Sequence, residues 1–326
     1  DGLNMPLPFP DALQEFKVET SSQNAQNGTH AGGTVSLVTK SGTNQFHGDA
    51  FEFARNHKFN ASSPFAGIDP KTGKRRDDGL SRNQFGGVLG GPIVQNKLFF
   101  FGAYQTGRST QIPADLIAFV PTPAMMAGDF SAYASAACNT RGAVTLNAAA
   151  GFVNNQIPAN RLSPAALALA KQLPQTTDPC GRTTYSNPTK PIENQGIFKM
   201  DWQISQDHQL FGRFINTTTF WNPPFADNKN LLSTSLGGRD SDAQSLAIGD
   251  TMVLSSALVN NIRFTYHSSN VHRTNSEFFD LSSLGVRNTY SYVPKVSLLA
   301  VTNSFNLGLG TEFDSYYRPK TYAFSD

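Results

Sequence analysis

Short segments in which apolar and polar residues alternate with a period of two recur along this chain, and they constrain its fold more than any other feature. The run FKMDWQI at residues 198–204 alternates without a break, and similar runs cover residues 49–55 and 261–267. Successive side chains of a β-strand point to opposite faces, so each run places its apolar residues on one face of a sheet. Because helical periodicity is rare in this sequence, the pattern predicts a mainly β protein.

The alternating runs are grouped in pairs that are separated by short polar turns. The clearest turns are Gln95-Asn96-Lys97 and Ser205-Gln206-Asp207-His208-Gln209, each of which lies between two predicted strands. Two alternating runs joined by a short polar turn are typical of a β-hairpin. The predicted hairpins cover residues 84–106, 198–216 and 245–267.

Long polar connections separate these hairpins from one another, and we expect them at about residues 107–193, 217–242 and 268–294. The first contains a predicted helix over residues 164–173, with Ser163 as its N-cap and Pro164 in the first turn. Loops of this length are uncommon in compact soluble domains. Strands of about ten residues that are joined alternately by short turns and long loops are typical of outer-membrane β-barrels. The sequence therefore predicts a partial transmembrane antiparallel β-barrel with all of its long loops on one side.

The composition supports a membrane protein that crosses with strands. Of the 326 residues, 15% are charged, against roughly 25% in soluble domains. No run approaches the roughly 18 apolar residues of a membrane-spanning helix. The net charge of +2 provides no field that would gather nucleic acid, so we expect no nucleic-acid partner. Aromatic residues of the predicted strands are candidates for a lipid-facing band: Phe99, Phe100, Phe101, Trp202, Phe264 and Tyr266.

The sequence contains no pattern typical of a catalytic or metal site. The nucleophile motif G-x-S-x-G, the zinc motif H-E-x-x-H and the pair C-x-x-C are all absent. The glycine-rich run at residues 86–91 lacks the Lys-Ser or Lys-Thr ending of a phosphate-binding loop, so we interpret it as a strand that another backbone approaches closely. We expect no enzyme activity, no cofactor and no bound metal.

The two cysteines, Cys138 and Cys180, lie in the same predicted loop. A disulfide that staples this loop in an oxidising compartment is the interpretation that we favour. A pair of unconnected thiols remains the alternative.

The first part of the chain carries a family resemblance. The run ALQEFKVETSSQNAQNGTHAGGTVSLVTKSGTNQFHG at residues 12–48 resembles the C-terminal end of the plug domain of TonB-dependent outer-membrane receptors. The runs GDAFEFARNHKFNA, RNQFGGVLGGPIVQNKLFFFGAYQ and VPTPAMMAGDFS that follow resemble the Oar-like branch of that family. The positions that match the plug motif are Glu15, Lys17, Gly32, Gly33, Val35, Val38, Thr39 and Lys40.

The resemblance implies two domains and a function in transport. Residues 1–44 would be the end of a small α/β plug domain, and residues 45–326 would be the N-terminal part of a large barrel. Because about seven barrel strands are recognisable and closed single-chain barrels have at least eight, we expect the chain to be a fragment. A receptor of this family in a Gram-negative outer membrane would bind an extracellular ligand and import it with energy from the TonB complex, which would act through a segment outside this sequence.

The ligand cannot be identified from the sequence, although a carbohydrate or a peptide would fit aromatic loop residues. Candidates for such contacts are Tyr133, Phe220, Trp221 and Phe225, for which packing within the loops is the alternative. Two other functions remain open at this point. A passive porin-like barrel would share the strands but would have no plug. A secreted β-rich adhesin or carbohydrate-binding protein would share the polar loops.

Overall fold

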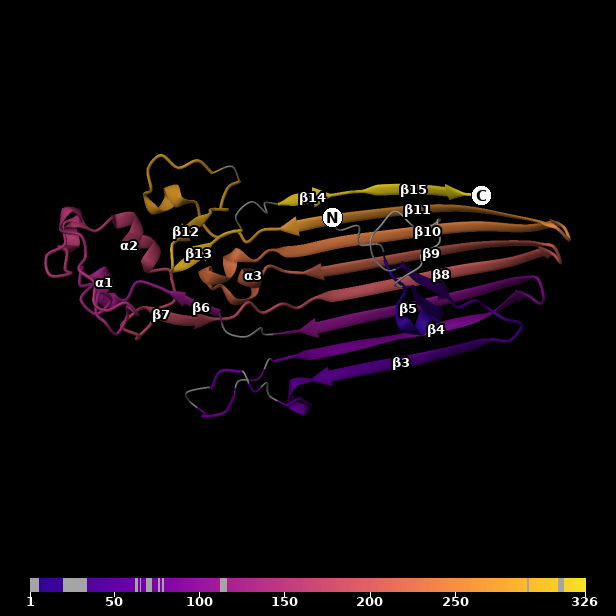
Figure 1. Cartoon of the computed structure of the whole chain (residues 1–326), viewed down its shortest axis with the longest axis horizontal. Helices are drawn as coiled ribbons and strands as arrows, with labels where there is room; N and C mark the ends of the chain where they lie inside the picture. The colour runs from indigo at the N-terminus through magenta and orange to yellow at the C-terminus, as the bar shows by residue number, and fades with distance from the viewer. Residues whose placement is uncertain are drawn as a thin grey trace.

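A single antiparallel sheet of nine strands dominates the structure, which is a computed structural model (Figure 1). It describes residues 6–19, 34–61, 64, 66–68, 72–75, 77, 79–111, 116–291, 293–309 and 314–326. The strands of the sheet are β3 (His47–Asn56), β4 (Ser81–Val94), β5 (Leu98–Thr110), β8 (Ile192–Ser205), β9 (His208–Trp221), β10 (Gly238–Ser255), β11 (Leu258–Thr274), β14 (Ser315–Tyr317) and β15 (Lys320–Ser325).

The order of the strands in the sheet follows their order in the sequence. From one edge to the other the sheet runs β3, β4, β5, β8, β9, β10 and β11, and both β14 and β15 pair with β11 at the far edge. All of these pairs are antiparallel. Within the described residues the sheet is open, because β3 does not pair with β14 or β15. The sequence prediction of about seven strands missed the short β14 and β15.

Short turns lie at one end of the sheet and long connections lie at the other (Figure 1). Residues 95–97, 206–207 and 256–257 form the short turns. In the first of them Asn96 adopts a positive φ of 61°, a backbone conformation that Asn tolerates better than most residues. The long connections cover residues 57–80, 111–191, 222–237 and 275–314. This segregation gives the sheet a turn end and a loop end.

The strands extend further toward the loop end than the sequence analysis predicted. The predicted loop over residues 217–242 begins with the last part of β9 and ends in β10, and that over 268–294 begins within β11. β10 has 18 residues and β11 has 17, whereas a membrane crossing needs only about 9–11. Beyond the crossing both faces are polar, so the alternation on which the prediction relied disappears there.

Several short elements fill the long connections. The connection after β5 contains β6 (Leu116–Phe119), α1 (Pro123–Met126), α2 (Pro164–Ala170) and β7 (Arg182–Tyr185), together with the 3-10 turns η4 (Ala148–Ala150) and η5 (Ala159–Arg161). The others contain η3 (His57–Phe59), α3 (Pro224–Asn228), η6 (Leu231–Ser235), η7 (Leu281–Leu284), β12 (Leu299–Val301) and β13 (Phe305–Leu307). Helix α2 begins where the sequence predicted, since the Ser163 hydroxyl accepts a bond from the Ala166 N–H, but it ends three residues early at Ala170.

The N-terminal part of the chain forms a separate small unit that crosses in front of the sheet in Figure 1. It consists of η1 (Pro10–Ala12), β1 (Leu13–Glu19) and β2 (Thr34–Thr39), and the two strands pair with each other in antiparallel register. The Lys40 N–H donates to the Ala12 carbonyl at 2.9 Å and so closes the base of this hairpin. Its assignment to a plug domain remains a prediction.

Candidate functional site at the inner face of the sheet and the loops above it

The sheet has two chemically different faces, and strand register assigns each side chain to one of them. The face that contacts residues 6–12 is called the inner face here. It carries Phe101, Ile197 and Ile215, while their sequence neighbours Phe100, Phe198 and Phe214 point to the opposite, outer face. Of the aromatic residues predicted to face lipid, Phe100, Trp202, Phe264 and Tyr266 lie on the outer face. Phe99 and Phe101 do not, because strand register places both on the inner face, where Phe101 is completely buried.

The outer face presents an apolar band across the middle of the sheet. One row of this band crosses five neighbouring strands through the register pairs Phe198 with Phe214, Phe214 with Leu246, Leu246 with Tyr266 and Tyr266 with Tyr322. Further members are Leu89, Tyr104, Trp202, Ile248, Phe264 and Phe324, and many of these large side chains are exposed. A continuous exposed apolar surface of this size requires contact with an apolar phase.

Gln195 fixes the N-terminal segment to the inner face. Its Oε1 accepts a hydrogen bond from the Phe9 N–H at 2.8 Å, and its Nε2 donates to the Leu7 carbonyl at 2.9 Å and to Thr217 Oγ1 at 2.8 Å. The side chain is buried, so these bonds are protected from competition with water. One side chain of β8 thus replaces the backbone partners that residues 7–9 would find in a regular strand.

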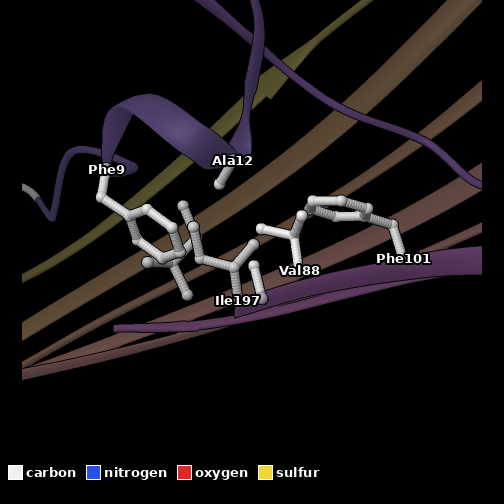
Figure 2. Close-up of a cluster of buried hydrophobic side chains, with 7 residues drawn as sticks. Phe9, Ala12, Val88, Phe101 and Ile197 are labelled. Carbon is white, nitrogen blue, oxygen red and sulfur yellow. The ribbon is translucent and has the colours of Figure 1, made fainter. Parts of the chain in front are cut away.

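A hydrophobic cluster reinforces this attachment (Figure 2). The Phe9 side chain points from the start of η1 toward the sheet, and Ala12 at the end of η1 is completely buried. Phe51 of β3 packs against the cluster, with its ring centroid 5.9 Å from that of Phe9. The buried members are Phe9, Ala12, Val88, Phe101, Ala103, Ile197 and Ile215.

The chain that leaves β2 stays close to the turn end of the sheet. A side chain at Gly42 would place its Cβ 2.3 Å from the Phe100 carbonyl oxygen and 2.6 Å from that of Gly91, so only glycine fits there. Asn44 and Asn96 exchange two hydrogen bonds, one between their side chains at 2.6 Å and one from the Asn96 N–H at 2.7 Å. The glycine-rich run of β4 is therefore approached closely by another backbone.

The sequence-predicted plug positions lie on the β1–β2 hairpin. Glu15 pairs with Val38 and Lys17 with Ser36, and Lys17 forms an ion pair of 2.6 Å with Glu19. Val35 and Val38 are about half exposed, while Thr39 is buried. Lys40 follows β2 and bonds to Ala12, as described above. Gly32 and Gly33 lie outside the described residues.

A second hydrophobic cluster unites three of the long connections into one cap at the loop end. Its buried members are Ala118, Val120, Leu173, Leu231, Leu232, Phe305 and Leu307. A cavity of about 300 Å³ lies beside it, between the α1–α2 region and the β12–β13 hairpin. Its walls are mainly apolar and include Phe119, Met125, Phe130, Leu167 and Phe305. The loops therefore form a packed layer of their own above the sheet.

Cys138 and Cys180 form a disulfide within this cap, with a Cα–Cα distance of 5.3 Å. It joins the middle of the longest connection to the residues just before β7. Cys180 also lines the cavity, and so does Tyr133, one of the aromatic residues proposed from the sequence as a ligand contact.

The other three aromatic candidates do not gather at one place. Phe220 and Trp221 belong to β9 rather than to a loop, and they point to opposite faces of it. Phe220 lies on the outer face, whereas the Trp221 ring lies 5.7 Å from the guanidinium carbon of Arg239 on the inner face. Phe225 packs edge-on against Phe278 within the cap. Trp221 and Tyr133 are therefore the candidates that line cavities.

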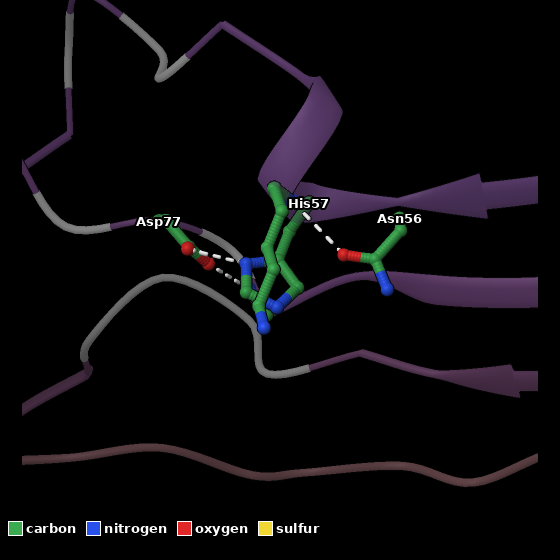
Figure 3. A network of polar contacts seen from close by, with 5 residues as sticks. Asn56, His57 and Asp77 are labelled. Carbon is green, nitrogen blue, oxygen red and sulfur yellow. Dashed lines mark hydrogen bonds and ion pairs between the residues drawn. The ribbon is translucent and has the colours of Figure 1, made fainter.

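The first long connection is fastened to the end of β3 by a histidine–aspartate pair (Figure 3). His57 Nδ1 lies 2.5 Å from Asp77 Oδ2, and the Gly79 N–H donates to Asp77 Oδ1. The bond from Gly79, helped by the His57 ring, holds the pKa of Asp77 below its usual value. Asn56 caps η3 by accepting a bond from the Lys58 N–H at 3.0 Å.

No helix among the described residues is long and apolar enough to cross a membrane. No group of three or more His, Cys, Asp or Glu side chains in the described part of the chain is placed to hold a metal ion.

Comparison with known families agrees with this architecture. The family described as an outer membrane beta barrel domain matches residues 38–326, which is most of the chain. The chain belongs to this family. Its place is accordingly the outer membrane, where the apolar band on the outer face contacts lipid.

One curated relative is similar to a shorter part of the chain. The TonB-dependent transporter Oar of Myxococcus xanthus is 30% identical over 101 residues, which are 28% of this chain and 9% of that protein. The match thus spans about a tenth of the relative's length. No solved structure matches the chain.

Proposed function

We propose that this chain is part of a TonB-dependent outer-membrane receptor of the Oar-like branch, which binds an extracellular ligand and imports it. Residues 1–44 would belong to the plug, and the nine-stranded sheet would be part of the barrel wall around it. The proposed work is binding and translocation, without bond chemistry. The similarity to the Myxococcus xanthus transporter supports this proposal.

The observation that carries the proposal is the attachment of residues 6–12 to the inner face. A passive pore needs a water-filled interior, yet here a separate chain segment covers the middle of the wall. The contact consists of two hydrogen bonds of Gln195 and one apolar cluster, which is a small interface.

The test is ligand import in cells that lack TonB. Because the ligand is unidentified, cells that carry the protein are given isotopically labelled spent medium, and retained compounds are compared with those of cells lacking the protein. The proposal predicts that protein-dependent uptake disappears without TonB. Uptake that persists would instead indicate the porin-like alternative.

The porin-like alternative makes a second, independent prediction. If the barrel were a passive pore, the purified protein would conduct ions in a planar bilayer without treatment. A plugged receptor conducts only after the plug has been displaced, for example by urea. The adhesin alternative predicts binding to cell surfaces without uptake.

A further inference from the structure

Three inward-facing side chains meet at the loop end of the inner face. Arg239 of β10 is the direct register partner of both Trp221 in β9 and Arg273 in β11. The Arg239 guanidinium lies over the Trp221 ring at 5.7 Å, which is within the range of a cation–π contact. The indole ring thus holds the guanidinium against the wall.

Arg239 has unused hydrogen-bonding capacity. Its Nε is buried and has no hydrogen-bond partner, and no ion pair joins Arg239 to a carboxylate among the described residues. Its sequence neighbour Asp240 belongs to the outer face by strand alternation, as does Asp242, which accepts a bond from Asn216 at 2.7 Å. A half-buried guanidinium whose Nε makes no bond is unusual, since buried polar groups are normally paired.

Arg239 lines two neighbouring cavities. One, of about 270 Å³, lies toward the loops and is also lined by Thr189, Trp221 and Arg273. The other, of about 350 Å³, lies between Arg239 and the start of the described chain at Pro6 and Leu7. Polar side chains line most of the second cavity: the carboxylate of Glu193 and the hydroxyl or amide groups of Gln195, Thr217, Thr219, Ser241 and Ser269. These volumes fall near the lower end of the range for small-molecule sites.

The inner face as a whole carries an excess of cationic side chains, which favours an anionic occupant, while Glu193 lines the cavity beside Arg239. By strand register and alternation, inward positions carry more cations than carboxylates. The cations are Arg55, Arg82, Lys199, Arg213, Arg239, Arg263 and Arg273, and the carboxylates are Asp49, Glu193 and Asp201. Since the whole chain has a net charge of only +2, this excess is local to the inner face.

We infer that Arg239 binds the oxyanion of a small, hydroxyl-rich ligand in the cavity between residues 6–7 and strands β9–β11. The planar guanidinium offers paired N–H donors that match a carboxylate or a phosphate. The hydroxyl-lined wall below it bonds the ligand's neutral groups, and Trp221 orients the guanidinium. This inference rests on the proposed receptor function and names the chemical class of its ligand.

Binding of three monosaccharide probes to the protein purified from outer membranes tests the inference. Isothermal titration calorimetry compares D-galacturonate, D-glucose 6-phosphate and neutral D-galactose. We expect at least one of the two acidic sugars to bind at least about tenfold more tightly than galactose, because a charge-assisted bond contributes on that order. Tighter binding of galacturonate would indicate that the natural ligand carries a carboxylate, and tighter binding of glucose 6-phosphate would indicate a phosphate. Equal affinity for all three, or no binding of either acidic sugar, would overturn the inference.

A matched pair of variants locates the site. Arg239→Gln keeps a polar side chain of similar length but removes the charge, and we expect it to weaken binding of the acidic sugar about tenfold or more. Arg108→Gln removes a charge from the outer face at the same end of the sheet and should leave the affinity unchanged. Equal affinities of the two variants would contradict the assignment. If Arg239→Gln fails to reach the membrane, the probe comparison on the unaltered protein still decides the question.

The inference and the proposed function fail in different ways. If uptake depends on TonB while acidic sugars show no preference, only the ligand class is wrong. If acidic sugars bind through Arg239 while uptake continues without TonB, the site exists in a protein that is not energised by TonB.

Discussion

Gln195 of β8 holds the main chain at Phe9, accepting the Phe9 N–H at 2.8 Å across a sequence separation of 186 residues. With its bond to the Leu7 carbonyl, this side chain makes the inner face a docking surface for the N-terminal segment. The wall and the segment across it are therefore coupled through one buried amide.

Replacement of Gln195 should loosen this docking. Gln195→Leu keeps the side-chain volume but leaves the buried Phe9 N–H without a partner, at a cost of about 1–3 kcal/mol. It also removes the bond to the carbonyl of Leu7, an exposed residue. We expect faster hydrogen exchange in residues 6–12 while the strands remain protected. Gln203→Leu is the control, because Gln203 also lies on β8 but bonds only to the nearby Ser205 carbonyl. The same exchange in both variants would contradict the account.

Gly42 should tolerate no side chain. In Gly42→Ala the new Cβ would meet the Phe100 and Gly91 carbonyl oxygens, so the segment over residues 40–46 must move away from β4 and β5. We expect a lower melting temperature and a longer distance between spin labels on that segment and β5. Gly102→Ala serves as the control, since nothing lies within 4 Å of its added Cβ. Unchanged stability of Gly42→Ala would show that the approach is not close.

Loss of the disulfide should affect the cap and not the sheet. The bond closes a loop with a sequence separation of 42 residues, for which chain entropy predicts a contribution of about 4 kcal/mol. In Cys138→Ser with Cys180→Ser we expect proteases to cleave within residues 111–191, whereas the strands stay resistant. Mass spectrometry of the fragments identifies the sites. Equal resistance before and after substitution would argue that cap packing alone holds the loop.

Acid should release the connection over residues 57–80 from the end of β3. The pKa of Asp77 is held below its usual value, so its bonds stabilise the loop above the unfolded pKa of about 4 and are lost as pH falls through the folded value. We expect lower protection factors, measured against the intrinsic exchange rate at each pH, at residues 57–61 and 79–80 below about pH 4. Asp77→Asn should show these lower protection factors already at neutral pH. Asp129→Asn is the control, because Asp129 bonds within a different loop through the Ser131 N–H. Protection factors of these residues that do not change with pH in the unaltered protein would refute the mechanism.

Alternation predicted those parts of the fold where one face meets lipid. The run over residues 198–204 shows this well, since Phe198, Met200 and Trp202 face outward in the structure as a period of two requires. Above the membrane the pattern fails. Thr217, Thr218 and Thr219 place polar side chains on both faces of β9, so the sequence predicts a loop at the end of this strand. The position of Trp221 beside Arg239 could therefore not be predicted.

The inner contacts were less accessible to sequence analysis for a similar reason. Gln195 and Arg239 gain their roles from partners that are far away in the sequence, namely Leu7, Phe9 and Trp221. A buried Gln on the polar side of a strand resembles any solvated Gln until its partner is placed. The family resemblance led us to expect a plug. The side chains that hold residues 6–12 against the wall are seen only in the three-dimensional structure.

On the proposed receptor function, residues 6–12 leave the wall when TonB acts on the protein. Ala12 is completely buried at rest, whereas Leu7 is 65% exposed, so each can be replaced by cysteine as a reporter. Cells with and without TonB are grown in rich medium and treated with a membrane-impermeant maleimide after permeabilisation of the outer membrane. We expect the cysteine of Ala12→Cys to be labelled only when TonB is present, whereas that of Leu7→Cys is labelled in both strains. Equal labelling of position 12 with and without TonB would contradict this proposal.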